Sequence, residues 1–75
     1  LTKNNLIIYK DENDFVIRAN ENINKVQMFD FSGKLIKEIN GNSKEIRINH
    51  INLVNGGYLL KIYKKEEILT KKVLK

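Results

Sequence analysis

Apolar side chains recur at every second residue in short runs along this chain, and polar clusters rich in Asn, Asp, Ser and Gly separate the runs. An extended strand points successive side chains to opposite faces, so a period of two is typical of half-buried β-strands. Turn signals spaced about 8 to 12 residues apart are typical of small all-β domains. The sequence therefore predicts seven strands, at residues 5–9, 14–18, 24–29, 34–39, 44–48, 58–63 and 68–74.

Seven short strands in one chain of 75 residues predict an all-β fold. The favoured architecture is a small seven-stranded antiparallel immunoglobulin-like β-sandwich, and a small barrel is the alternative. A chain of this length forms one domain, so residues 1–75 are expected to make a single β-sandwich. Because the chain has no cysteine, its core must come from Ile, Leu, Val, Phe and Tyr.

Polar clusters predict where the chain turns. Residues 20–22 read as a turn, and residues 30–33 as a tight hairpin in which Gly33 supplies a positive φ. The Asn-Gly pair within residues 40–43 is a strong hairpin signal, and residues 64–67 join the last two strands. Four turns of this kind would separate the predicted strands into hairpins.

Alternation within the strands predicts which side chains face the core. Ile46 and Ile48 are expected to point inward, while Glu45 and Arg47 point outward. The Asn-rich segment 49–55 is expected to form a short helical turn that plugs one end of the core.

The formal net charge of +5 raises the question of an anionic partner. Only two of the 14 basic residues are arginines, and bidentate guanidinium contacts dominate specific readers of phosphates and bases. A solvated cationic face is therefore favoured over nucleic-acid binding. No apolar run reaches the roughly 18 residues that a membrane helix needs, so no stable membrane insertion is expected.

Few residues could carry catalysis. His50 is the only histidine, it has no cysteine beside it, and it is expected at the rim of the fold. Asp11, Glu12 and Asp14 could bind calcium, but they lack the spacing of an EF-hand and are better read as solvated loop charges. Glu66-Glu67 beside Lys64-Lys65 likewise reads as a hydrated hairpin tip. We expect no enzyme, no cofactor and no metal site.

Three aromatic residues lie out of phase with the core positions. Phe29, Phe31 and Tyr63 could form a platform for a sugar, although such platforms usually contain Trp, which this chain lacks. The alternative is that each ring covers the second face of the sheet or a hairpin corner. Gly56-Gly57 reads as a close-packed turn at a strand entrance rather than as a flexible hinge.

The order of several short motifs resembles the C-terminal sorting domain of the type IX secretion system across nearly the whole chain. Each motif is weak alone, and their order and spacing carry the resemblance. Gly57 departs from the family pattern, which usually has a β-branched or similar residue there. The matching pieces are Leu6-Ile7-Ile8-Tyr9, Asn13-Asp14-Phe15-Val16-Ile17, Ile23-x-x-Val26-x-Met28-Phe29-Asp30 leading to Gly33-Lys34, Ile46-x-Ile48, Leu53-x-x-Gly56-x-Tyr58-Leu59-Leu60-Lys61-Ile62 and Lys72-Val73-Leu74-Lys75.

The resemblance implies recognition rather than catalysis. A domain of this family follows a cargo domain in the same chain, and the outer-membrane secretion machinery and a sortase-like protease recognise it. The protein would then be periplasmic in transit and afterwards secreted or held at the cell surface. The positions that carry over are Gly33, Lys34, Leu53, Gly56, Tyr58, Lys71, Lys72, Val73, Leu74 and Lys75. The alternative function is an adhesive or carbohydrate-binding module of a cell-surface protein.

Overall fold

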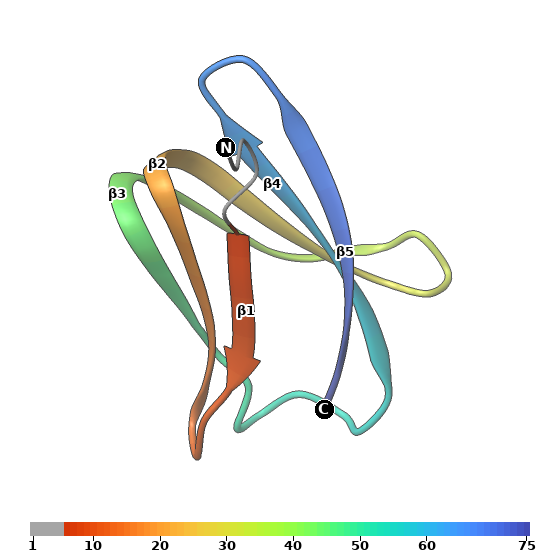
Figure 1. Ribbon diagram of the computed structural model, residues 1–75. Coiled ribbons are helices and arrows are strands. Elements are labelled where there is room, and N and C mark those ends of the chain that lie inside the picture. Colours follow the sequence, from red (N-terminus) through yellow and green to blue (C-terminus); the bar gives the residue numbers. More distant parts are fainter. Residues whose placement is uncertain (1–5) are drawn as a thin grey trace.

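The computed structural model describes residues 6–75, which form one antiparallel sheet of five strands (Figure 1). The strands are β1 (Leu6–Lys10), β2 (Asp14–Asp30), β3 (Leu35–Asn49), β4 (Gly57–Lys64) and β5 (Ile68–Leu74). The predicted all-β class is confirmed, but the predicted number of strands is wrong. The expected start of the first strand at Asn5 lies outside the described residues.

Two of the predicted turns lie inside long strands, which explains why there are five strands and not seven. Residues 20–22 belong to β2 and residues 40–43 to β3, and both strands bend there side by side. Pairing continues through the bend at Ile23 with Ser43 and at Lys25 with Asn40. Because the two strands turn together, much of the ladder of backbone hydrogen bonds persists where a hairpin would have ended it.

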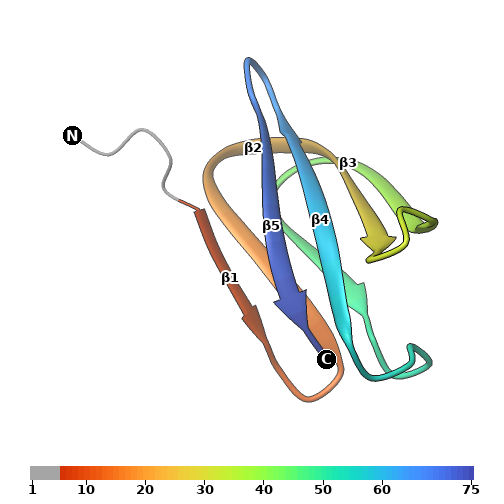
Figure 2. The ribbon, with the colours of Figure 1, turned by 90° about the vertical axis from the view of Figure 1, so that its right-hand side faces the viewer.

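The bend folds the sheet over a single core (Figure 2). The first half of β2 pairs with β1, and its second half pairs with β4, while β3 follows β2 along the other edge. One continuous sheet therefore supplies both sides of the core. The buried cluster contains Phe15, Ile17, Ile23, Val26, Met28, Ile46, Ile48, Tyr58, Leu60, Ile62 and Val73.

The predicted faces of the strands are confirmed. Ile46 and Ile48 are buried and Arg47 is exposed, and in β4 the residues Tyr58 and Leu60 face the core. The segment between β3 and β4 forms turns, and residues 6–75 contain no helix, so the expected helical plug is wrong. It follows that none of these residues forms a helix long and apolar enough to cross a membrane.

Lys64 closes the end of the core at the last position of β4. The amide of Lys64 donates to the carbonyl of Glu67 at 2.9 Å, which confirms the predicted turn. The side chain of Lys64 is fully buried, and so the expected hydrated tip is wrong at this residue. Its Nζ lies 3.5 Å from a carboxylate oxygen of Glu21 and 4.0 Å from one of Glu67, with no hydrogen-bond partner among the described residues.

Candidate functional site

The motif residues from three separate segments converge on one part of the sheet. We call the set the terminal motif cluster, and it consists of Gly33, Lys34, Leu53, Gly56, Tyr58, Lys71, Lys72, Val73, Leu74 and Lys75. Asp30, at the start of the β2–β3 hairpin, pairs with Tyr58 of β4, and Tyr58 pairs with Val73 of β5. The sheet register thus brings together segments that are about 40 residues apart in sequence.

The β2–β3 hairpin at residues 30–34 is built around the carboxylate of Asp30. One oxygen of Asp30 accepts hydrogen bonds from the amide and hydroxyl of Ser32 and from the amide of Lys34. These bonds, chiefly the one from the Ser32 hydroxyl, hold the pKa of Asp30 below its ordinary value. Gly33 has a φ of 92°, as predicted, because a left-handed residue is required there.

The hairpin packs against β4 through the ring of Phe31. A Cβ atom at Gly57 would stand 2.7 Å from Cζ of Phe31, so the ring occupies the space that any other residue would fill. The Nζ of Lys72, on β5, lies 5.6 Å from the centre of the same ring. Gly57 therefore allows the close approach of the Phe31 ring, in keeping with the expected close-packed turn.

Lys75 fastens the end of β5 to the turn that precedes β4. Its amide donates to the carbonyl of Gly56 at 2.9 Å, and its Nζ donates to the carbonyls of Leu53 at 2.6 Å and Ile51 at 3.0 Å. Gly56 has a φ of 148°, a conformation that favours glycine. These contacts hold the Leu53–Gly56 segment and the last residues of the chain as one unit.

Tyr58 anchors the turn from inside the fold. Its side chain is buried, and its hydroxyl donates to the carbonyl of Val54, four residues earlier. Val73 is also in the core, whereas Lys71, Lys72 and Leu74 are exposed. Within the terminal motif cluster, Tyr58 and Val73 therefore support the structure, and the three exposed residues of β5 are open to a partner.

β5 is an edge strand, since among residues 6–75 it pairs with β4 alone. The backbone hydrogen bonds from Lys64 to Glu67 and from Lys75 to Gly56 show which residues along β5 bond to the neighbouring strand. Hydrogen-bonded pairs alternate along antiparallel strands, so the odd-numbered residues from 67 to 75 bond to β4. The remaining backbone groups point away from β4, and they belong to Ile68, Thr70, Lys72 and Leu74.

A hollow of about 220 Å³ separates the end of β5 from β1. Its lining comes from β1, from the last residues of β5 and from Phe15. Figure 2 shows that β1 and β5 run in the same direction. An extended segment entering the gap would meet backbone groups on the edge of β5.

His50 is buried with 6% of its surface exposed, so its expected place at the rim is wrong. Its ring lies 5.1 Å from the ring of Phe15, and its Nε2 lies 3.1 Å from the carbonyl oxygen of Asp11. Its backbone amide donates to the carbonyl of Asn13 at 2.9 Å. These contacts tie the β1–β2 turn to the end of β3, which is a structural role.

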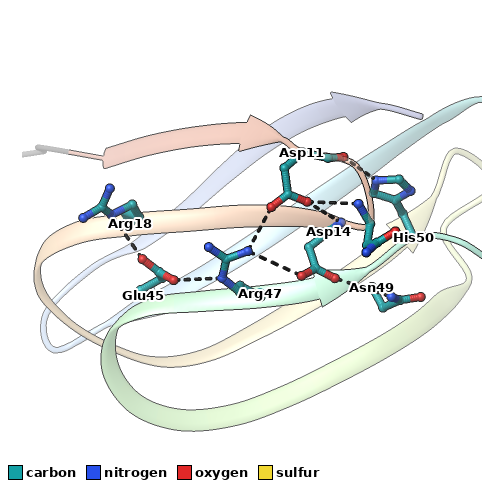
Figure 3. Close-up of polar contacts among 8 residues, drawn as sticks. Asp11, Asp14, Arg18, Glu45, Arg47, Asn49 and His50 are labelled. Carbon is teal, nitrogen blue, oxygen red and sulfur yellow. Dashed lines mark hydrogen bonds and ion pairs between the residues drawn. The ribbon is translucent and has the colours of Figure 1, made fainter.

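Asp11 and Asp14 belong to an ion-pair network with Arg47 rather than to a set of solvated loop charges (Figure 3). Glu12 is exposed, as expected of a solvated loop charge. Nη1 of Arg47 lies 2.9 Å from Asp11 and 3.5 Å from Asp14, and its Nε lies 2.9 Å from Glu45. Glu45 also pairs with Arg18 at 3.2 Å. The hydrogen bonds that Arg47 donates to Glu45 and Asp11 raise the pKa of its guanidinium.

Asp11 also shapes its own turn. One carboxylate oxygen of Asp11 accepts from the amides of Asp14 and Asn13, at 2.8 and 3.1 Å. These backbone bonds, together with Arg47, lower the pKa of the Asp11 carboxyl. Across residues 6–75, no group of three or more His, Cys, Asp or Glu side chains is arranged to hold a metal ion.

The predicted aromatic residues lie on the outer face of the second half of the sheet. Phe29 and Tyr63 alternate with buried residues along β2 and β4, so they point to the face opposite the core, and Phe31 covers Gly57. Nζ of Lys25 lies 4.5 Å from the centre of the Tyr63 ring, and the Tyr63 hydroxyl donates to Gln27 at 2.8 Å. Protein groups therefore already contact the rings of Tyr63 and Phe31.

The fold and the terminal motif cluster define a small antiparallel β domain with an exposed edge strand. In a comparison with protein-family models, the model of a domain of unknown function (DUF8694) matches residues 1–75. The chain therefore belongs to this family. No curated protein matches the sequence.

Proposed function

We propose that this domain is a non-catalytic secretion signal of the type IX system. It directs an attached upstream cargo domain from the periplasm across the outer membrane to the medium or the cell surface. The outer-membrane machinery and a sortase-like protease would be its partners, and the two sides of its curled sheet would pack as the layers of an immunoglobulin-like sandwich do. The observation that supports the proposal is the convergence of Gly33-Lys34, Leu53-x-x-Gly56-x-Tyr58 and residues 71–75 in one cluster.

The edge of β5 is the part of the cluster that a partner would read. Lys72 and Leu74 expose both their side chains and their outward-facing backbone groups. A partner strand can hydrogen-bond to such an edge while pockets on the partner select the side chains. The lysines of the same strand protect the free protein from unselective edge pairing.

A fusion experiment tests the proposal. Residues 1–75 are placed after a reporter protein with a periplasmic export signal, in a host that has the type IX system and in an isogenic strain that lacks it. We expect the reporter in the medium or on the surface of the first strain and in the periplasm of the second. A folded fusion that stays in the periplasm of both strains would refute the proposal.

A proline substitution separates recognition of the β5 edge from folding. Lys72→Pro removes an amide that points away from β4, so we expect the fold to persist with a change in stability within about 1 kcal/mol. If the secretion machinery recognises the edge of β5, secretion of Lys72→Pro should fall to background. Lys72→Gln is the matched control for the lost charge and should retain secretion. Deletion of residues 71–75 should also abolish secretion, with circular dichroism reporting the remaining fold.

A further inference from the structure

A second hollow, of about 380 Å³, lies at the bend of the sheet. We call it the bend hollow, and its lining residues come from β2, from β3 and from the turn between β4 and β5. Figure 1 shows these bends and this turn at the top of the view, with the C-terminus at the bottom. The lining residues are Glu21, Asn22, Asn24, Asn42, Lys44 and Lys65.

Strand register explains why the bend is hollowed. Arg18 pairs with Glu45 and Ile23 with Ser43, so residues 19–22 of β2 stand opposite residue 44 alone of β3. Ala19 pairs with Leu6 of β1 and packs against the core, whereas Asn20, Glu21 and Asn22 are exposed and have no partner in β3, as extra residues in a β-bulge do. Ile23 is completely buried, and its neighbours in sequence therefore face away from the core.

The polar groups of the bend hollow are available to a ligand. Within residues 6–75, the side-chain amides of Asn22, Asn24 and Asn42 form no hydrogen bond, and Lys44 and Lys65 form no ion pair. The one acidic residue, Glu21, already lies 3.5 Å from the buried ammonium of Lys64. The hollow therefore presents three amides and two uncompensated cations.

These groups match a particular ligand chemistry. A primary amide both donates and accepts hydrogen bonds, which suits the hydroxyl groups of a sugar, and lysines supply point charges for a carboxylate. The lining contains no aromatic ring, so stacking would contribute nothing. We propose that the bend hollow binds an anionic sugar, namely a pyranose carrying a carboxylate group, as a free monosaccharide or within an acidic polysaccharide.

Titration followed by ¹H–¹⁵N correlation spectra tests this proposal with the whole chain. With galacturonate as the probe, we expect saturating shifts confined to the amides of residues 21–24, 42–44 and 65. Neutral galactose should bind at least about tenfold more weakly, and rising salt should weaken galacturonate binding. Polygalacturonate distinguishes the two sources, because tighter binding than the monosaccharide favours a polysaccharide ligand.

Two pairs of variants separate the site from general charge. The double variant Lys44→Gln, Lys65→Gln should weaken galacturonate binding by about tenfold or more. The double variant Lys34→Gln, Lys71→Gln loses the same charge elsewhere and should stay within about twofold. The absence of saturating shifts at about 10 mM galacturonate would overturn the proposal. Equal losses in both double variants, or equal shifts with a short oligonucleotide, would overturn it as well, because they indicate binding of any polyanion.

Discussion

Replacing Lys64 by methionine should make the protein more stable. The side chain of Lys64 is fully buried, and its ammonium group has no hydrogen-bond partner among residues 6–75. Its two ion pairs are long, at 3.5 Å to Glu21 and 4.0 Å to Glu67. Methionine keeps the apolar stem within the core and removes the buried charge.

The distances give the size of the expected effect. Because the side chain of Glu21 is 60% exposed, its attraction to Lys64 is close to the solvent limit, about 1 kcal/mol at this separation. Glu67 adds a similar amount at most. Burial of an ammonium costs several kcal/mol, so we expect Lys64→Met to raise the free energy of unfolding by about 1 kcal/mol. For a domain of this size that corresponds to a rise in Tm of about 4 to 8 °C.

Urea denaturation and thermal melting, both followed by circular dichroism, measure the change. Lys65→Met is the matched control, because Lys65 is exposed and its replacement should change stability by less than about 0.5 kcal/mol. Glu21→Gln should instead destabilise the protein, since it leaves the buried charge with one partner fewer. A loss of more than about 1 kcal/mol in Lys64→Met would show that the ion pairs outweigh the burial cost and refute the reasoning.

Three further predictions concern packing and protonation. Gly57→Ala should destabilise the protein by about 1 kcal/mol more in the presence of Phe31 than in a Phe31→Ala background, because the new Cβ would stand 2.7 Å from the ring; a double-mutant cycle with no coupling would contradict this. The pKa values of Asp11 and Asp30 are lowered in the folded protein, so their contribution to stability is complete above the ordinary value of 3.8 and is lost as the pH falls through the lower folded values. Asp30→Asn should therefore flatten the acid limb of a plot of stability against pH. Leu60→Ala, at a completely buried position, should cost about 2 to 5 kcal/mol by denaturant unfolding, and a loss below 1 kcal/mol would place Leu60 outside the close-packed core.

Strand positions and faces could be predicted from the sequence because alternation depends only on which side of a strand is buried. The order of Tyr58, Leu60 and Ile62 therefore matched the structure. Turn signals were less decisive. Residues 20–22 and 40–43 have the composition of turns, but a pair of bent strands also needs polar residues on its outer side.

The candidate sites depend on contacts between distant segments, which no local pattern contains. Phe31 lies over Gly57, and Arg47 meets Asp11 across a gap of 36 residues. The sequence did contain a signal for the contact between Arg47 and Glu45, because both residues alternate with buried isoleucines and so lie on one outer face. The burial of His50 had no such signal, since its position is set by the turn at Asn13 that it packs against.

β2 lies on both sides of the core. Within residues 6–75, it is the only strand that pairs with β1, β3 and β4, so neither side of the core can separate without disrupting it. Unfolding should accordingly be a single cooperative event, without a half-open intermediate. In native-state hydrogen exchange, amides at both ends of β2, near Ile17 and near Met28, should exchange together and among the slowest in the chain.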